Sequence, residues 1–326
     1  MNSRTLETLT RHAYHQGIDL ALFCGDLING YTTREAEFRS QLRTWKAAVA
    51  PIGPYVPIYE SMGNHDALVD QGTLPDGKGG TLAVTFDKLG AESAEAVFAD
   101  EFVNPRSGPP PEGEGAPPYA ETVYWFDRGH TRFVALNTNY WYSSRPERFG
   151  GNLEGHVMDG QLRWLEALLE KTAKDDAIRH VFVAAHEPAF PCGGHAKDAQ
   201  WYHGGDPKRN GGIDRTYVVK RRDELWAVLA RTGKVVAVLF GDEHNYSRML
   251  VDRSLNPAFA HPVWHIVSGG CGAPYYARDR SVPWADRVVA FSAQQNYCLV
   301  RIEGSRVVLE VWGATGERID RAVLRE

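Results

Sequence analysis

The tetrapeptide Gly63-Asn64-His65-Asp66 brings an amide oxygen and an imidazole side by side in a chain of 326 residues. The glycine lets the backbone turn sharply, and the aspartate can orient a histidine ring. An apolar run at positions 56–59 comes just before this group, so we expect it at the carboxyl end of a β-strand. Side chains of these types, presented together, can bind a metal ion or move a proton.

Three further apolar runs end in side chains of the same kinds. Positions 18–24 lead to Gly25-Asp26, positions 181–185 lead to His186, and positions 235–240 lead to Gly241-Asp242-Glu243-His244. Hard divalent cations bind carboxylate and amide oxygens, and imidazole suits Zn, Fe and Mn. Since open α/β folds place their sites at the carboxyl ends of the strands, the four groups together predict one metal site.

The order and spacing of these motifs resemble the calcineurin-like metallophosphoesterases, a superfamily that includes the purple acid phosphatases. Its signature runs Asp-x-His, Gly-Asp, Gly-Asn-His-Asp/Glu, a single His after a strand, and Gly-His-x-His. The last four blocks correspond here to Gly25-Asp26, positions 63–66, His186 and positions 241–244, so the resemblance extends from about residue 3 to the carboxyl terminus. No Asp-x-His block precedes Gly25, and Asp242 replaces the first His of the last block.

The resemblance implies that Asp26 bridges two metal ions. Asn64 and His186 would bind the second ion, and His244 would bind the first. Asp242 would either bind a metal ion itself, which favours harder ions such as Mn or Mg, or lie behind the ligands. The ions would be Mn, Fe, Zn, Co or Mg, two in the complete family pattern and one or two in this chain.

The resemblance gives His65 a catalytic role without a metal ion. Its ring would protonate the leaving oxygen of the substrate, and Asp66 would hold the other ring nitrogen and raise the pKa of His65. The purple acid phosphatases owe their colour to a tyrosine ligand three residues after the Gly-Asp aspartate. Asn29 has that position here, so we expect no Fe(III)–tyrosinate chromophore.

The segment after position 186 becomes polar and rich in glycine as far as Gly212. It contains His195, His203 and Arg209, which would line the substrate pocket and meet a phosphate group with positive charge. The same composition is typical of a solvated loop, and the sequence leaves both interpretations open.

Helix and strand patterns alternate along the chain. Helices are expected at positions 2–16, 33–50, 161–170 and 222–231, each leading to an apolar strand, which is typical of a parallel sheet covered by helices. A hairpin is expected at 121–137, and successive strands at 248–251, 263–267, 297–302 and 307–311. This α/β (α+β) pattern fits the four-layer αββα sandwich of the resembled family, with two mixed β-sheets flanked by helices.

We expect one domain over residues 1–326, because the site residues run from Asp26 to His244. The segment from Asn104 to Pro118 is rich in Pro and Gly, which predicts a surface loop insertion. Relative to the family, the chain as written is expected to be truncated at its amino terminus, without the first core strand and its Asp-x-His block. A gap is then expected beside the strand at positions 18–24.

Composition excludes some functions and leaves others open. The formal net charge of −5, with both signs mixed, shows no nucleic-acid footprint, and no apolar run is long enough to cross a bilayer. Cys192 and Cys271 lie in loops expected at one rim, so a disulfide between them is an open alternative. Oligomeric state and location stay open, with a slight lean towards periplasmic or secreted if an upstream signal has been removed.

The leading hypothesis is a metal-dependent hydrolase of small-molecule phosphoric esters. A metal-activated hydroxide would attack phosphorus in line, opposite the leaving oxygen, and His65 would donate the proton. Phosphomonoesters, phosphodiesters and nucleotides all stay open as substrates. The rival hypothesis is an impaired or inactive member that binds metal or a phosphate ligand, which the missing first block and Asp242 favour.

Overall fold

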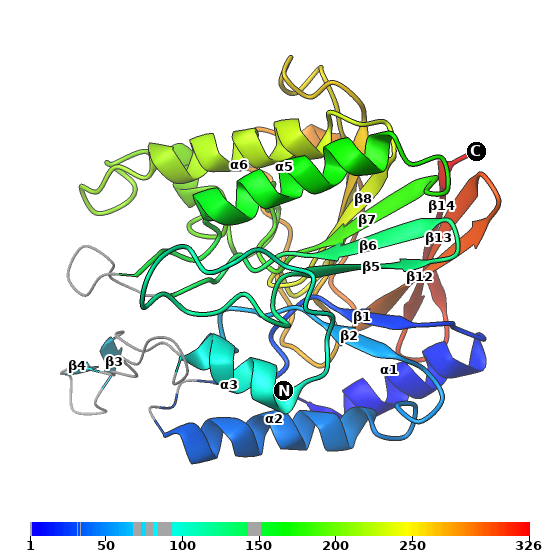
Figure 1. The fold of residues 1–326 in the computed structure, drawn as a ribbon, viewed down its shortest axis with the longest axis horizontal. Helices are drawn as coiled ribbons and strands as arrows, with labels where there is room; N and C mark the ends of the chain where they lie inside the picture. Colours follow the sequence, from blue (N-terminus) through cyan, green and yellow to red (C-terminus); the bar gives the residue numbers. More distant parts are fainter. Residues whose placement is uncertain are drawn as a thin grey trace.

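Two β-layers face each other between two layers of helices (Figure 1). The computed structural model describes residues 2–30, 32, 34–67, 73–75, 81–83, 93–142 and 151–326. In it α5 and α6 cover one outer side, and α1, α2 and α3 lie on the other. The predicted αββα sandwich is therefore confirmed.

The elements have the following bounds. The helices are α1 (Ser3–His15), α2 (Glu35–Val49), α3 (Ala94–Glu101), α5 (Asp159–Ala173) and α6 (Thr216–Leu229), with short 3₁₀ turns η2 (Tyr202–Gly205) and η3 (Ala285–Arg287). The strands of the first half are β1 (Ala21–Phe23), β2 (Ile58–Glu60), β3 (Thr73–Pro75), β4 (Thr81–Ala83), β5 (Tyr124–Arg128), β6 (Thr131–Ala135) and β7 (His180–Ala184). The later strands are β8 (Val235–Phe240), β9 (Tyr246–Val251), β10 (Val263–Ser268), β11 (Val288–Ser292), β12 (Asn296–Glu303), β13 (Arg306–Gly313) and β14 (Arg318–Arg325).

The first layer is a seven-stranded mixed sheet in the order β11-β9-β10-β8-β7-β6-β5. Its central strands β6, β7, β8 and β10 run parallel, and the flanking strands pair antiparallel. Val181 and Val183 of β7 belong to one core cluster with Leu165 of α5 and Leu225 of α6, whereas Phe182 belongs to the cluster on the opposite face. Coverage of both faces explains why β7 and β8 are almost wholly apolar.

The second layer consists of two separate pieces. β1 and β2 form a parallel pair, and β12, β13 and β14 form an antiparallel sheet. Within the ranges that the structure describes, no strand pairing joins the two pieces. Leu309 of β13 shares a core cluster with Phe182 of the first layer, while Phe38 and Trp45 of α2 pack with Phe23 of β1.

The strand predicted at positions 18–24 is shorter in the structure, where β1 covers Ala21–Phe23. Its partner β2 is equally short, and it is the only strand that pairs with β1 in the described part of the chain. Backbone N–H and C=O groups need partners along the whole length of a strand. The ladder between β1 and β2 covers only three residue pairs, and it limits both strands to that length.

The Pro- and Gly-rich segment 104–118 contains neither helix nor strand, but it is not wholly exposed. Asn104 is buried, and the Glu112 carboxylate accepts hydrogen bonds from the backbone N–H groups of Gly160 (2.9 Å) and Gln161 (3.0 Å). These amides belong to the first turn of α5, whose own N-cap residue, Met158, makes no side-chain cap. The segment therefore caps the amino-terminal end of α5, although it lies far from that helix in the sequence.

All four cysteines are free thiols, so the open alternative of a Cys192–Cys271 disulfide is not realised in this structure. Among the described helices, none is long and apolar enough to cross a membrane.

Candidate metal centre

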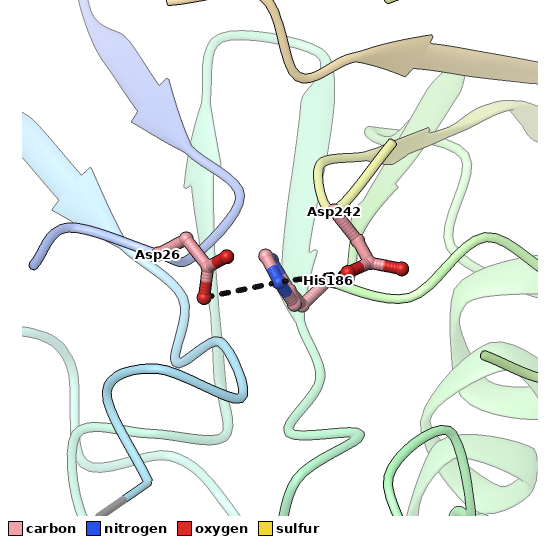
Figure 2. Close-up of side chains that lie close together, drawn as sticks. All are labelled: Asp26, His186 and Asp242. Atoms are coloured by element: carbon pink, nitrogen blue, oxygen red, sulfur yellow. Dashed lines mark ion pairs between the residues drawn. The ribbon is translucent and has the colours of Figure 1, made fainter. Parts of the chain in front are cut away.

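Three strand ends meet at one point of the sandwich (Figure 2). Asp26 follows β1, His186 follows β7 and Asp242 follows β8. His186 Nε2 lies 3.2 Å from Asp26 Oδ1 and 3.7 Å from Asp242 Oδ1, and one ligand atom from each residue lies within 4.8 Å of the others. This is the geometry of side chains that can share a metal ion.

A backbone hydrogen bond orients the His186 ring. Its Nδ1 donates to the carbonyl oxygen of Cys24 at 2.5 Å, which turns Nε2 towards the two carboxylates. Burial opposes a charge on the ring, but Asp26 and the neighbouring carboxylates raise the pKa of His186, so Nε2 carries a proton that a bound metal ion would displace. Asn64 Oδ1 lies 3.3 Å from the same Nε2. The structure thus brings four predicted ligands together: Asp26, Asn64, His186 and Asp242.

Glu154 contributes to the site although no motif marks it in the sequence. Its carboxylate accepts a hydrogen bond from Asn64 Nδ2 at 3.2 Å, so the amide oxygen of Asn64 is turned towards His186. Glu154 is separated from Asn64 by ninety positions and follows no apolar run, so only the tertiary structure associates the two residues.

The strand ends approach so closely that several residues adopt unusual backbone conformations. Asp26 and Asp242 have positive φ angles of 55° and 59°, which are costly for non-glycine residues. A Cβ atom on Gly25 would lie 2.5 Å from His186 Nδ1, and one on Gly63 would lie 2.4 Å from the Asp26 amide nitrogen. The two glycines of the motifs are therefore required by contact between the loops.

His65 faces Asp26 from the loop after β2. Its Nδ1 hydrogen bonds to the carbonyl oxygen of Asn29 at 2.7 Å, and its Nε2 lies 4.0 Å from Asp26 Oδ2. Asp66 has a different role from the predicted one, because its carboxylate accepts the backbone N–H groups of Leu27 (3.0 Å) and Gly63 (2.9 Å). The sharp turns leave these buried amides without other acceptors, and Asp66 joins the two loops by satisfying them.

His244 lies beside this group and not within it. Its ring stacks on Tyr276 with 4.2 Å between centroids, and it lines the same cavity as Asp26. His244 Nδ1 is buried and has no hydrogen-bond partner in the described part of the chain. A buried polar atom without a partner is costly, so this atom indicates that a further group belongs here.

Of the three residues predicted to bind substrate, His195 is the one at the site. Its Nδ1 lies 2.9 Å from Asp198 Oδ1 and 3.5 Å from Asp242 Oδ2. Burial opposes its positive charge, but these two carboxylates outweigh burial and raise the pKa of His195 to about 10. His203 is half-buried and Arg209 is exposed, further along the same loop.

Glu243 bonds the loop after β7 and not the candidate ligands. Its carboxylate accepts the backbone N–H groups of Cys192 (2.9 Å) and Gly193 (2.5 Å), which fixes the start of the loop that carries His195.

The acidic residues of the site fit a divalent cation. Burial would raise the pKa of Asp26, but the adjacent His186 holds it at about 2. Burial raises the pKa of Asp242 to about 8 against the opposing charges of His195 and His186, and it also raises the pKa of Glu154. Carboxylates gathered in this way ionise together only when positive charge compensates them, and a metal ion supplies such charge.

Comparisons with known proteins agree with the fold. A model of the calcineurin-like phosphoesterase family matches residues 2–246. The structure is similar to purple acid phosphatase PPD1 from yellow lupin (Lupinus luteus) seeds, with a TM-score of 0.62 and 18% identity over 99% of this chain and 49% of that one. It is also similar to PhoD, with a TM-score of 0.61 and 12% identity over 96% of this chain and 68% of that one. The chain spans about half of the lupin protein, and a search of curated proteins found no match.

Proposed function

Because this chain belongs to the calcineurin-like phosphoesterase family, we propose that it hydrolyses phosphoric esters with the help of divalent metal ions. The observation that carries the proposal is the convergence of Asp26, Asn64 and Asp242 on Nε2 of His186. These oxygen and nitrogen ligands, together with the unpartnered Nδ1 of His244, suit Mn, Fe, Zn, Co or Mg. Bound there, a divalent cation would polarise a phosphoryl oxygen and lower the pKa of water.

His65 is the proposed proton donor to the leaving oxygen. The Asn29 carbonyl holds a proton on Nδ1, so that Nε2, which faces Asp26, is the atom that gains and loses the proton in turnover. His195 stays protonated beside Asp242 and Asp198, and its charge is available to a phosphate oxygen. His203 and Arg209 remain proposed substrate-binding residues on the adjoining loop.

Glu154 is proposed as a positioning residue. It acts through Asn64, whose amide it turns so that the oxygen and not the nitrogen faces the metal ligands. Replacement of Glu154 by Ala should weaken metal binding, and Glu154→Gln should largely restore it, because the Gln side-chain oxygen still accepts the Asn64 hydrogen bond. Rescue by Gln separates positioning from a general loss of packing.

The test is an assay of chelated protein to which Mn, Zn, Fe, Co or Mg is added back singly. p-Nitrophenyl phosphate and bis-p-nitrophenyl phosphate distinguish monoesterase from diesterase activity. We expect metal to restore turnover, and we expect His65→Ala to lower it by about 10²–10⁴-fold with metal content unchanged. His186→Ala should lower metal content itself.

His261→Ala is the matched control, because His261 is exposed and lies in the loop between β9 and β10. It should change neither metal content nor turnover. A protein that binds metal and phosphate but hydrolyses neither ester under any of the five metals would overturn the enzymatic proposal in favour of a binding protein.

A further inference from the structure

The ring of Tyr276 contacts two histidines of the candidate metal centre. It is stacked on the ring of His244, with 4.2 Å between centroids and 11° between planes. It also lies 5.3 Å from the ring of His195, at an angle of 56°. Tyr276 belongs to the loop that follows β10, which none of the sequence motifs includes, so only the tertiary structure brings it to the site.

The ring of His244 is held differently from the other histidine rings of the site. Nδ1 of His186 (2.5 Å) and Nδ1 of His65 (2.7 Å) each donate to a backbone carbonyl group. Nδ1 of His195 lies 2.9 Å from the carboxylate of Asp198. Among the residues that the structure describes, none forms a hydrogen bond with the ring of His244, and its Nδ1 is buried without a partner.

Stacking supplies the restraint that hydrogen bonds supply elsewhere in the site. A histidine that binds a metal ion is normally oriented by a hydrogen bond at its other ring nitrogen. The imidazole of His244 has no such bond, but a parallel aromatic ring at 4.2 Å limits the orientation of its plane. The backbone adds a second link, since the N–H of Tyr276 donates to the carbonyl oxygen of His244 at 3.2 Å.

The Tyr276 ring is itself kept in place by the loop that carries His195. A Cβ atom on Gly194 would lie 2.7 Å from Cδ2 of Tyr276, so the ring fills the space beside this glycine. The loop is fixed in turn, because the N–H of Gly193 donates to the Glu243 carboxylate at 2.5 Å. The ring that stacks on His244 therefore has little freedom to move.

We propose that Tyr276 is a positioning residue of the candidate metal centre. Its ring holds the imidazole of His244 in the orientation that leaves Nδ1 available to a metal ion, and so replaces the hydrogen bond that orients His186. The proposal rests on the proposed function in one respect, because it takes His244 as a metal ligand. It concerns metal binding and not the hydrolysis of an ester.

The ring of Tyr276, and not its hydroxyl group, has this role. In the part of the chain that the structure describes, the hydroxyl group has no hydrogen-bond partner, whereas the ring contacts His244, His195 and Gly194. Tyr276→Phe keeps the ring and should retain the metal affinity of the unsubstituted chain. Tyr276→Leu keeps an apolar side chain without the flat ring and should weaken metal binding about tenfold.

The test measures the dissociation constants of Zn²⁺ and Mn²⁺ by competition with a fluorescent chelator, with no ester present. Tyr275→Leu is the matched control, because Tyr275 is 62% exposed and makes no ring contact with another described residue. It should leave both dissociation constants unchanged. Unchanged affinity in Tyr276→Leu, or an equal loss in Tyr276→Phe or in Tyr275→Leu, would overturn the proposal.

A double-mutant cycle tests whether Tyr276 acts through His244. His244→Ala should weaken metal binding, and the addition of Tyr276→Leu should cause no further loss, because the ring that Tyr276 positions is already absent. Losses that multiply, or unchanged affinity in His244→Ala, would each overturn the proposal. A chain that shows the expected metal affinities but hydrolyses no ester would contradict the proposed function and leave this inference standing.

NMR of the unsubstituted chain keeps the test valid if Tyr276→Leu fails to fold. The ring protons of His244 should resonate upfield, because they lie over an aromatic face, and nuclear Overhauser effects should connect them to the ring protons of Tyr276. Both signals should persist in Tyr276→Phe and after the addition of Zn²⁺, since the stack is expected to hold the ring while the metal ion is bound. Loss of the stack when Zn²⁺ binds would overturn the proposal.

Discussion

The seven-stranded sheet and the divided layer opposite it have similar apolar sequences but differ in how completely their strands are paired. β8 has β7 and β10 as neighbours and extends over six residues. Among the residues that the structure describes, β1 pairs with β2 alone and extends over three, although the apolar run around it is longer. β12 also has one described strand partner and yet extends over eight residues, because its ladder with β13 is continuous. The comparison teaches that the length of an edge strand depends on the ladder that it forms with its one partner, and the β1–β2 ladder covers only three residue pairs.

The candidate metal centre lies where these two regions meet. His186 and Asp242 extend from β7 and β8 of the fully paired sheet, whereas Asp26 and Asn64 extend from β1 and β2 of the divided layer. A metal ion bound by all four would connect His186 and Asp242, which extend from strands paired on both sides, to Asp26 and Asn64, which extend from the short β1–β2 pair. The predictions below measure how different the two halves are.

The largest expected difference is in amide hydrogen exchange. In the protein alone, amides in the middle of β8 should exchange at least about 10³-fold more slowly than that of Leu22, because local opening of a half-paired strand costs much less than opening of a buried one. Exchange monitored by mass spectrometry or NMR gives the ratio. Similar protection of the two strands would contradict the comparison.

A divalent cation should reduce this difference, because it links the two regions. At a free concentration of about one hundred times its dissociation constant, the cation should raise the free energy of unfolding by about 2.7 kcal/mol. Urea titrations with and without chelator measure the increase. His186→Ala should abolish it and His261→Ala should preserve it; an increase that survives His186→Ala would mean that the metal binds elsewhere.

Truncation of an apolar side chain should lower the free energy of unfolding by about 2 kcal/mol more in the seven-stranded sheet than in the divided layer. Ile266→Ala empties a fully buried position of β10 and should cost roughly 2–5 kcal/mol. Leu22→Ala in the half-buried β1 should cost less than about 1 kcal/mol, since its side chain is already beside a cavity. Chemical unfolding of both variants tests the order, and a larger loss for Leu22→Ala would reverse it.

The dependence of stability on pH should have opposite signs in the two regions, and per pH unit it is the smallest of the expected effects. Burial raises the pKa of Glu60 in β2 to about 8, so the folded protein keeps this proton while the unfolded chain loses it. Stability should therefore fall by on the order of 1 kcal/mol per pH unit as the pH rises from about 5 to about 8. Glu60→Gln should remove this loss, and an unchanged slope in that variant would show that Glu60 is ionised in the fold.

His265 of β10 provides the counterpart in the seven-stranded sheet. Burial lowers its pKa to about 3, and its Nε2 accepts the backbone N–H of Phe190 at 3.1 Å, which requires the neutral ring. The unfolded chain binds a proton below about pH 6.5, so stability should fall as the pH decreases from there. In a His265→Gln variant, the free energy of unfolding should fall less as the pH decreases below about 6.5. Chemical unfolding at a series of pH values measures the difference.

The candidate ligands could be predicted because each one directly follows an apolar run. Asp26, Asn64, His186 and Asp242 are marked by local sequence alone, and parallel strands bring the carboxyl ends within each sheet to one edge. Packing of the two sheets then brings the pair of Asp26 and Asn64 to the pair of His186 and Asp242. His65 could be predicted for the same reason. The partners that hold these side chains could not, since Glu154 and the Asn29 carbonyl are distant in sequence or belong to the backbone.

Elements with strong periodicity were also predictable, whereas weakly patterned ones were not. α1 and α2 form within two residues of their expected ends, because apolar residues recur on one face of each helix and Asn2 caps the first. β14 was missed, since Arg318–Arg325 mixes charged and apolar residues and is held by its pairing with β13. β11 was missed as well, and its ladder to β9 contains a register shift.

The sequence by itself determined the sandwich of two β-layers between helices and the side chains that gather at the strand ends. Both follow from local patterns: apolar periodicity selects helix or strand, and the residue after a strand is carried to the sheet edge. Only the tertiary structure decided that Asp66 joins two loops and that Glu154 orients Asn64. It also decided that the second layer is open between β1 and β12. Hydrogen bonds and edge pairing between distant segments depend on which backbone groups remain without partners after packing, and no local pattern records that.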